Sequence, residues 1–291
     1  MSAGQAGLSC ELVAAMTSDG IKLHGAWHPA SAQPSVNIDA VLLLHGTGSN
    51  FYSSSLWHGL IPRFAEAGLP ALAVNTRGHD LATAVSALGQ RRLIGAAYEQ
   101  IDECRHDVRA WLDWLAVRGM SRVALLGHSM GGLKAIYSQA CDPHPQVTCV
   151  VAVSAPRLVY SAFVASPHGA LFQSDLSRAE ALVAAGRPET LIEVTFPIPY
   201  TITASGYIDK YGREERYDLL KHAPRLKVPM LCTFGQRELR GAAFAGMPER
   251  WEELAQTGKP ITVEVIADGD HVYTGCHSEL AARIVRWLKR R

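Results

Sequence analysis

An apolar run that ends in a glycine-flanked serine constrains the fold of this chain more than any other feature. Val-Ala-Leu-Leu occupies residues 123–126, and Gly-His-Ser-Met-Gly-Gly follows at residues 127–132, before a helix-like stretch that reaches Ala140. Four apolar residues are too few for a buried helix, but they suit a parallel strand that is covered on both faces. The sequence therefore predicts a strand, a sharp turn and a helix, with Ser129 at the turn.

Ser129 has the position that a catalytic nucleophile requires. A serine at a sharp strand-to-helix turn adopts a strained backbone conformation, and glycines beside it allow neighbouring segments to approach closely. The first N–H groups of the following helix lack intrahelical partners, so the N–H of Met130 can donate a hydrogen bond to a developing oxyanion. A Gly-x-Ser-x-Gly match can arise by chance. The strand before it and the helix after it favour the catalytic interpretation.

The motif and its surroundings resemble the α/β-hydrolase family, and the resemblance extends from about Val13 to the C-terminus. It implies an α/β fold with a mostly parallel central sheet flanked by helices, and a triad in the chain order serine, acid, histidine. After the apolar run at residues 40–44, His-Gly-Thr-Gly at residues 45–48 resembles the family's turn after its first parallel strand. The backbone N–H of Thr47 is therefore expected to bind the oxyanion together with that of Met130.

The triad acid is expected to be Glu238. Gly-Gln-Arg-Glu at residues 235–238 follows an apolar run and resembles the family's Gly-x-x-Asp turn, with Glu in the acid position. Glutamate can hold the imidazole tautomer as aspartate does. Asp268 and Asp270 stay open as alternatives. The other acid position of the fold, after the strand predicted at residues 147–153, reads Ser-Ala-Pro and offers no carboxylate.

His271 is expected to be the general base. It follows a strand-like alternation at residues 261–267 and lies on a polar loop that resembles the family's histidine turn. It also comes after Glu238 in chain order, as the fold requires. His79 lies in a turn that resembles the family's Arg-Gly-His-Gly loop, but it precedes the serine and so has the wrong order.

The stretch from Pro156 to Leu226 breaks the alternation of strands and helices. A connection of about seventy residues must hold elements of its own, and the family inserts a helical lid at this point. The resemblance thus implies a hydrolase core at residues 1–155 and 227–291, with a lid at residues 156–226.

Aromatic side chains are concentrated in this stretch, which holds eight of the sixteen Phe and Tyr residues of the chain. Such a concentration can attach a lid to the body, line a pocket, or do both. Phe196 and Tyr200 flank a rigid, apolar Pro-Ile-Pro segment. Both are expected to contact substrate, with His128 beside the nucleophile as a third substrate contact.

Shorter patterns predict further elements. Two β-prone runs, Leu8–Thr17 and Ile21–His28, are joined by Ser-Asp-Gly and are expected to form an antiparallel hairpin at the sheet edge. Trp57–Gly68 is expected to be a helix whose regular part begins at Pro62. A polar, alanine-rich connection is expected before the long helix predicted at Tyr98–Arg118.

Composition narrows the class of protein. The chain has 291 residues, 48% of them hydrophobic, and a formal net charge of +1 without a long run of either sign. It can bury a large core, and it lacks the charge pattern typical of proteins that bind nucleic acid or anionic membranes. Without a basic and apolar leader or a spanning apolar stretch, it is expected to be cytoplasmic. Its six cysteines lack metal-type spacing and are expected to be reduced and buried.

Together with the resemblance, these features predict a serine hydrolase that cleaves a carboxylic ester of a small apolar or aromatic molecule through an acyl-enzyme. Such a mechanism needs no cofactor and no metal. Hydrolases of thioesters, amides and carbon–carbon bonds, and acyltransferases, share the fold and stay open. A hydrolase-fold receptor that binds a small molecule without catalysis is the alternative of another class. The sequence carries no signal for an oligomeric state.

Overall fold

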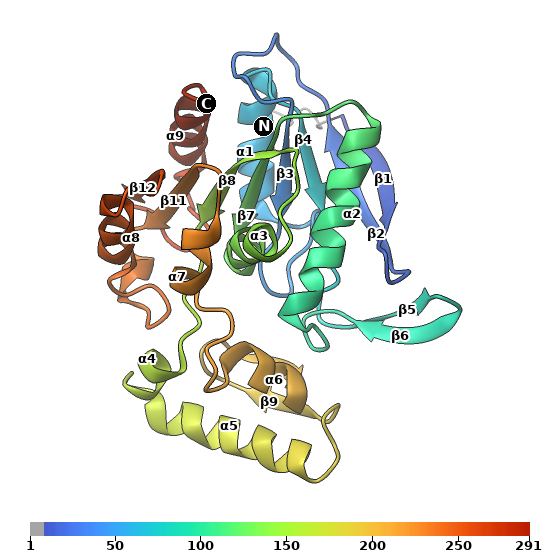
Figure 1. Ribbon diagram of the computed structural model, residues 1–291, viewed down its shortest axis with the longest axis vertical. Coiled ribbons are helices and arrows are strands. Elements are labelled where there is room, and N and C mark those ends of the chain that lie inside the picture. Colours follow the sequence, from blue (N-terminus) through green and yellow to red (C-terminus); the bar gives the residue numbers. More distant parts are fainter. Residues whose placement is uncertain (1–8) are drawn as a thin grey trace, which may run out of the picture.

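An eight-stranded sheet forms the centre of the computed structural model, which describes residues 9–291 (Figure 1). The strand order is β1-β2-β4-β3-β7-β8-β11-β12, and the six strands from β4 to β12 in this order run parallel to one another. The mostly parallel α/β fold predicted from the sequence is confirmed. The strands are β1 (Glu11–Met16), β2 (Lys22–His28), β3 (Ala40–Leu44), β4 (Ala71–Val74), β7 (Val123–His128), β8 (Val147–Val153), β11 (Met230–Gly235) and β12 (Ile261–Ile266).

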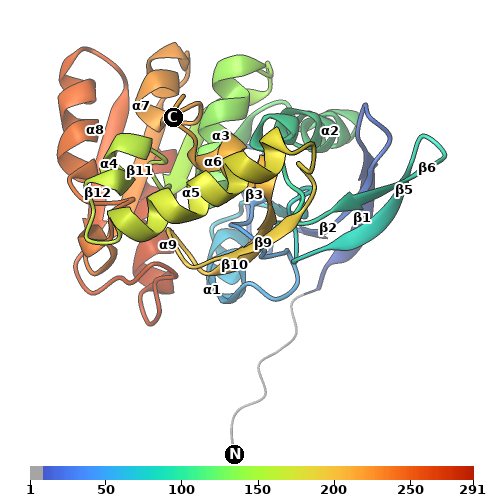
Figure 2. The same cartoon turned by 90° about the horizontal axis from the view of Figure 1, so that it is seen from below.

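Helices cover both faces of the sheet, which explains why its central strands are apolar without interruption. Leu42 and Leu44 of β3 belong to the hydrophobic core on one face, whereas Val41 and Leu43 belong to the core on the other. Figure 2 shows α2 and α3 on one side of the sheet and α1 and α9 on the opposite side. The helices are α1 (Ser55–Glu66), α2 (Cys104–Val117), preceded by a 3₁₀ turn η1 (Ile101–Glu103), α3 (Met130–Cys141), α8 (Met247–Gln256) and α9 (His277–Leu288).

The N-terminal hairpin lies at the edge of the sheet, as predicted. β1 and β2 pair antiparallel from Glu11 opposite Trp27 to Met16 opposite Lys22. β2 in turn pairs antiparallel with β4, so the hairpin extends the parallel sheet. The expected strand start at Leu8 lies outside the described residues.

Helix α1 begins earlier than predicted. Its regular part starts at Ser55, not at Pro62, because the side chain of Ser54 caps the helix by accepting a hydrogen bond from the Trp57 N–H. Pro62 lies inside the helix, where a proline typically costs about 3 kcal/mol. Leu60 and Phe64 on either side of it are fully buried. We infer that burial of this apolar face offsets the cost.

The expected connection before α2 contains a β-hairpin that the sequence analysis missed. β5 (Thr83–Ala87) and β6 (Gln90–Ile94) pair antiparallel and project from the body at the right of Figure 1. Most of their side chains are exposed or half-buried, so the strands lack the apolar alternation by which strands are found. Arg92 of β6 forms ion pairs with Asp19 and Glu103, which attach the hairpin to the body.

Most of the 156–226 segment, from α4 to α6, forms a layer below the carboxyl ends of the parallel strands, whereas α7 lies beside α3 of the body (Figure 1). Besides the expected helices, the segment contains a two-stranded antiparallel sheet, which the sequence analysis did not predict. Phe172 and Tyr207 are fully buried within it. Its elements are α4 (Tyr160–Val164), α5 (Gly169–Ala184), β9 (Leu191–Val194), β10 (Tyr200–Thr203), α6 (Ala204–Tyr211), α7 (Leu219–His222) and the 3₁₀ turn η2 (Ala223–Arg225).

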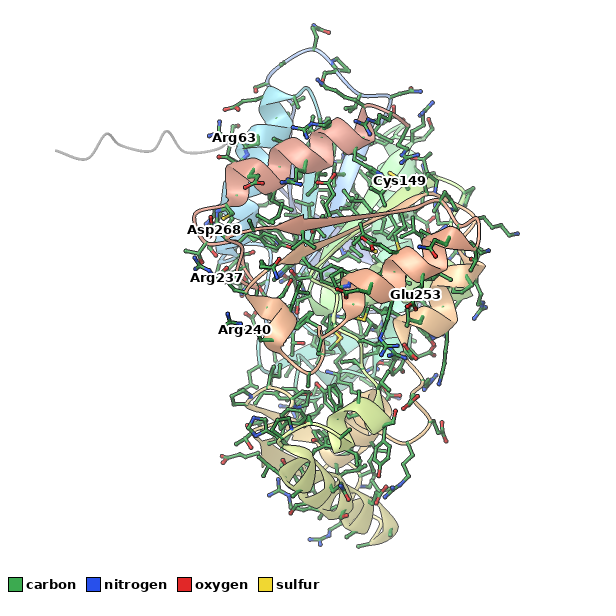
Figure 3. The ribbon with its side chains drawn as sticks, turned by 90° about the vertical axis from the view of Figure 1, so that its left-hand side faces the viewer. Arg63, Cys149, Arg237, Arg240, Glu253 and Asp268 are labelled. Atoms are coloured by element: carbon green, nitrogen blue, oxygen red, sulfur yellow. The ribbon has the colours of Figure 1, made fainter. Side chains whose placement is uncertain are left out.

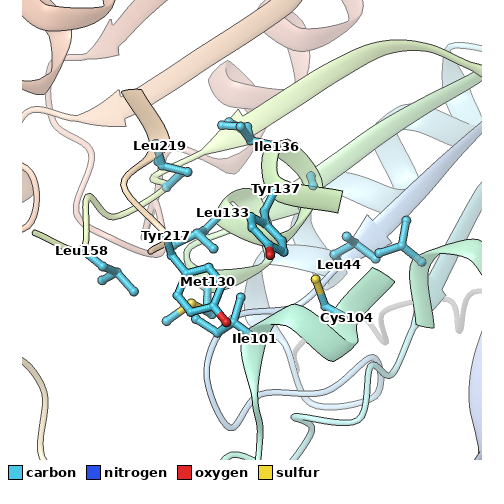
Figure 4. Packing of buried hydrophobic residues seen from close by; sticks show 14 of the residues in the cluster. Leu44, Ile101, Cys104, Met130, Leu133, Ile136, Tyr137, Leu158, Tyr217 and Leu219 are labelled. Carbon is cyan, nitrogen blue, oxygen red and sulfur yellow. The ribbon is translucent and has the colours of Figure 1, made fainter. Parts of the chain in front are cut away.

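Aromatic and aliphatic side chains join this segment to the body. Figure 4 shows Tyr217 and Leu219 beside the side chains of α3. The rings of Tyr217 and Tyr137 meet edge to face with centroids 5.1 Å apart. The Tyr217 hydroxyl also accepts a hydrogen bond from the Asp102 N–H at 3.1 Å. The aromatic residues of the segment therefore contribute to a core that is continuous with that of the body.

The cysteines are all free, but only three of the six are buried, namely Cys104, Cys149 and Cys232. The expectation that the thiols are buried therefore holds for half of them. No helix within residues 9–291 combines the length and the apolar character needed to cross a membrane.

Candidate active site

Ser129 occupies a strained turn between β7 and α3. Its backbone has φ 55° and ψ −124°, a conformation that costs a residue with a side chain on the order of 1–3 kcal/mol. Gly131 makes the turn possible, because a Cβ at this position would lie 2.1 Å from the carbonyl oxygen of Leu44. The predicted strand, turn and helix are present, and Ser129 stands at the carboxyl end of a central strand.

Three side chains from separate turns form a hydrogen-bonded chain at this edge of the sheet. Ser129 Oγ lies 3.0 Å from Nε2 of His271. Nδ1 of the same ring lies 2.6 Å from Oε2 of Glu238. Glu238 begins the 3₁₀ turn η3 (Glu238–Arg240) after β11, and His271 lies in the loop after β12. The structure thus brings together the serine, acid and histidine that were predicted from the sequence.

The other candidates have different partners. Asp268 is exposed, and its nearest cationic partner is Arg237 at 3.9 Å. Asp270 accepts hydrogen bonds from the N–H groups of Val272 and Thr274, and so stabilises its own loop. Nδ1 of His79 lies 2.8 Å from Oδ2 of Asp80. Neither aspartate replaces Glu238 at Nδ1 of His271.

Glu238 is held by a buried network that the sequence analysis missed. Its Oε1 accepts hydrogen bonds from the Gly235 N–H at 2.8 Å and from the Ser154 hydroxyl at 2.6 Å. The Tyr273 hydroxyl lies 2.9 Å from Ser154 Oγ and 3.1 Å from Thr233 Oγ1. Both oxygens of the carboxylate are therefore occupied, which fixes its orientation toward His271. Ser154 follows β8, at the acid position of the fold that offers no carboxylate in this chain.

The His-Gly-Thr-Gly turn lies against the serine. A Cβ at Gly46 would stand 3.0 Å from Cβ of Ser129, so the small residue allows the turn to approach. Within residues 9–291, neither the Thr47 N–H nor the Met130 N–H donates a hydrogen bond to another residue. Both residues line the pocket beside Ser129. Their N–H groups are thus available to a ligand atom.

His45 stabilises this turn through hydrogen bonds of its ring. It is fully buried, and burial together with Lys134 lowers its pKa to about 3, so the ring is neutral. Nε2 accepts a hydrogen bond from the Thr76 N–H at 3.0 Å. The proton is therefore on Nδ1, which donates to the Gly46 carbonyl oxygen at 2.7 Å. The arrangement agrees with a structural role for His45.

An apolar pocket of about 290 Å³ opens beside Ser129. Phe196 lines it, as expected, and contributes one wall from the 156–226 segment. The wall between η3 and α8 was not foreseen, because its Gly-Ala-Ala-Phe sequence carries no pattern that indicates a pocket. The lining residues are Thr47, Ser129, Met130, Pro156, Leu158, Phe196, Pro197, Ile198, Tyr211, Gly241, Ala242, Ala243, Phe244 and His271.

Two expected substrate contacts do not line this pocket. The ring of His128 is buried against Trp57, and its Nε2 donates a hydrogen bond to the His271 carbonyl oxygen at 2.7 Å. Burial and the neighbouring His271 lower the pKa of His128 to about 3, so the ring stays neutral. Tyr200 lies behind the wall, with its hydroxyl 3.3 Å from that of Tyr211, which takes the lining position instead. His128 supports the loop that carries His271, and Tyr200 supports the wall.

The family model of the alpha/beta hydrolase family matches residues 41–290, which are most of the chain. The chain belongs to this family. Within residues 9–291 of this hydrolase, no group of three or more His, Cys, Asp or Glu side chains is arranged to hold a metal ion.

Solved structures of esterases have the same fold as this hydrolase. The Pyrococcus furiosus esterase Pf2001 is 19% identical, with a TM-score of 0.65 over 97% of this chain and 91% of that one. Est1E from Butyrivibrio proteoclasticus, solved with ferulic acid, is 13% identical, with a TM-score of 0.64 over 94% and 97%. An esterase from Exiguobacterium antarcticum is 17% identical, with a TM-score of 0.59 over 95% and 98%. No curated protein sequence matches the chain.

Proposed function

We propose that this hydrolase cleaves a carboxylic ester of a small apolar or aromatic molecule through an acyl-enzyme on Ser129. The observation that carries the proposal is the hydrogen-bonded chain from Ser129 Oγ through His271 to Glu238, which ends in an apolar pocket. A nucleophile, a base that can accept its proton and a carboxylate that orients the base are the groups that acyl transfer requires.

In the first half of the reaction, Nε2 of His271 accepts the proton of Ser129 as Oγ attacks the ester carbonyl carbon. Glu238 accepts the Nδ1–H of His271, which keeps Nε2 free as the base and stabilises the imidazolium. The N–H groups of Thr47 and Met130 donate to the carbonyl oxygen as it becomes negative. His271 then returns the proton to the departing alkoxide, and the acyl group stays on Ser129.

In the second half, water takes the place of the alcohol. His271 accepts a proton from this water, whose oxygen attacks the acyl carbon and forms a second oxyanion at the same N–H groups. When that intermediate collapses, His271 protonates Ser129 Oγ and the carboxylic acid leaves. Every proton is thus exchanged through Nε2, and the enzyme returns to its starting state without a cofactor.

The pocket supports a small apolar or aromatic substrate. Aromatic and aliphatic side chains form most of its walls, and Ser129 and His271 also line it. Ferulic acid, which the Est1E structure carries, is an aromatic carboxylic acid of a size suited to such a pocket. We propose that the 156–226 segment acts as the lid of a core formed by residues 1–155 and 227–291, since it supplies Phe196 and Tyr211 to the pocket.

A panel of matched chromogenic esters, thioesters and anilides tests the proposal. We expect hydrolysis of the aryl ester of a small apolar acid, with a transient burst of phenolate as the acyl-enzyme accumulates. A higher kcat/KM for the thioester or the anilide would contradict the ester assignment. If none of the three reacts and a fluorophosphonate does not label the protein, the proposal that the chain is an enzyme is wrong.

Phe196→Ala should change the selectivity of the pocket. The substitution removes a wall, so kcat/KM for a bulky aromatic ester should fall at least about tenfold relative to an acetate ester. Tyr200→Ala is the matched control, because Tyr200 supports the wall without lining the pocket. It should lower thermal stability and change both esters by a similar factor, since lost core packing costs about 3–5 kcal/mol. An equal effect of Phe196→Ala on both esters would contradict its role as a wall.

Ser154→Ala should lower kcat about tenfold while KM changes little. The Ser154 hydroxyl donates to Glu238 at 2.6 Å, and a hydrogen bond to a charged group contributes about 1.5–3 kcal/mol. Its loss frees the carboxylate to turn away from His271. Thr233→Val is the control, because Thr233 contacts Tyr273 at the far end of the network. Steady-state kinetics of both variants measure kcat and KM. An equal loss of kcat in Ser154→Ala and Thr233→Val would indicate a general packing effect and contradict the specific role of Ser154.

A further inference from the structure

A second hollow of about 460 Å³ adjoins the apolar pocket, and we call it the outer hollow because exposed side chains line it. Phe196, Pro197, Gly241 and Ala242 line both spaces, so the two hollows lie next to each other at these residues. The outer hollow differs in chemistry, because exposed polar side chains stand around it. The residues that line only the outer hollow are Ser166, Pro167, His168, Leu171, Thr195 and Arg240.

Arg240 is the cationic residue of this outer hollow. It ends η3, two positions after the triad acid, and its side chain is exposed. Figure 3 shows it between the sheet and the 156–226 segment. Within residues 9–291, Arg240 forms no ion pair and no side-chain hydrogen bond, and no Asp or Glu lines either hollow. Its neighbour Arg237 lies toward the sheet, 3.9 Å from Asp268.

From this arrangement we infer that the outer hollow binds a carboxylate at the end of the substrate remote from the scissile ester. The inference rests on the proposed function. The apolar pocket holds the middle of the molecule, and the guanidinium of Arg240 binds the terminal carboxylate through paired N–H donors. The preferred substrates are therefore half-esters of apolar dicarboxylic acids, or esters of similar length with one terminal carboxylate.

A single carboxylate fits this site better than a phosphate. One guanidinium balances one negative charge, whereas a phosphate monoester carries about −1.5 to −2 at neutral pH. The other polar side chains of the hollow, Ser166, Thr195 and His168, bring no further permanent cation. Because Arg240 is exposed, solvent and salt screen its charge, and the expected preference is modest.

The test compares two p-nitrophenyl esters of suberic acid that differ at the far end, where one carries a carboxylate and the other a neutral carboxamide of the same shape. The measured quantity is the ratio of their kcat/KM values. We expect Arg240→Gln to lower this ratio about fivefold. Arg237→Gln, which removes an equal charge from a side chain outside both hollows, should leave the ratio unchanged. Arg240→Lys should retain part of the preference. Equal falls in the two Gln variants would overturn the inference.

Binding without chemistry separates this inference from the proposed function. The half-amide of suberic acid and its diamide carry no ester, and their dissociation constants can be measured by NMR titration. We expect the wild-type protein to bind the half-amide about fivefold more tightly, and Arg240→Gln to lose that advantage. Equal affinities of the wild type for both ligands would overturn the carboxylate site even if esters are hydrolysed. If the wild-type protein binds the half-amide more tightly than the diamide and Arg240→Gln does not, the carboxylate site is supported even if no ester is hydrolysed.

Discussion

Replacement of Ser129 by Ala should leave the protein folded and lower kcat for the preferred ester by about a millionfold. Ser129 Oγ is the hydroxyl that His271 contacts at 3.0 Å, and alanine keeps the Cβ that packs beside Gly46. Without the hydroxyl no acyl-enzyme can form. Mass spectrometry after treatment with a fluorophosphonate measures this directly, since the adduct should appear on Ser129 of the wild type and be absent from the variant.

His271→Ala should be nearly as damaging, because residues that act as a unit have effects that do not add. The double variant should therefore be little worse than either single one. His79→Ala is the matched control, since His79 bonds to Asp80 instead of to the serine. An adduct on another residue, or normal turnover by His271→Ala together with loss of activity in His79→Ala, would contradict the assignment.

The parallel strands could be predicted because each is buried on both faces. An uninterrupted apolar run such as residues 40–44 meets hydrophobic side chains above and below the sheet, so its pattern reflects its position directly. The exposed strands of the hairpin at residues 83–94 carry no such pattern. The start of α1 was predicted too late, because a proline is common in the first turn of a helix and Pro62 is the first such signal, whereas the helix is capped by the Ser54 side chain and begins at Ser55.

The turns that carry Ser129, Glu238 and His271 could be found from the sequence because the backbone of a tight turn restricts which residues can occupy it. Glycine is required at position 131, because a Cβ there would lie 2.1 Å from the carbonyl oxygen of Leu44. The chain order serine, acid, histidine then favoured His271 over His79 as the general base. The geometry supports these three residues as a triad, and their catalytic roles stay predictions until the variants are measured.

The support around the triad and the pocket wall could not be found in this way. Ser154 reaches Glu238 because β8 and β11 pair in a register that places Ser154 beside the end of β11, where its N–H donates to the Thr233 carbonyl oxygen. Tyr211, and not Tyr200, faces the pocket because of how α6 packs within the 156–226 segment. Both outcomes depend on contacts between residues far apart in the chain, which local patterns do not encode.

A buried charge cluster joins the body to the 156–226 segment. Glu99 is fully buried and forms ion pairs with Lys134 of α3 and with Lys210 of α6, the latter at 3.3 Å. Lys134 also donates to the Thr76 hydroxyl at 3.0 Å. Burial alone would raise the pKa of Glu99, but the two ammonium groups lower it to about 2. One carboxylate therefore pairs with two lysines that lie on opposite sides of the junction.

Glu99→Gln should lower the free energy of unfolding by about 3–5 kcal/mol, because it leaves two buried ammonium groups without a counter-ion. Urea unfolding at neutral pH measures the loss. The pKa of Glu99 is lowered in the folded state, so its contribution is present above its unfolded pKa of about 4.5 and disappears as the pH falls toward 2. The difference between wild type and variant should accordingly shrink over that range.

Glu180→Gln is the matched control for this prediction. Glu180 forms an ion pair with Arg213 at 3.4 Å within the same segment, but both side chains are exposed to solvent. Loss of such a pair typically costs less than about 1 kcal/mol. If Glu99→Gln lowered the free energy of unfolding no more than Glu180→Gln does, the buried ion pairs of Glu99 would contribute no more to stability than an exposed pair. A large loss confined to Glu99→Gln would instead show that the attachment of the segment depends on this single buried charge.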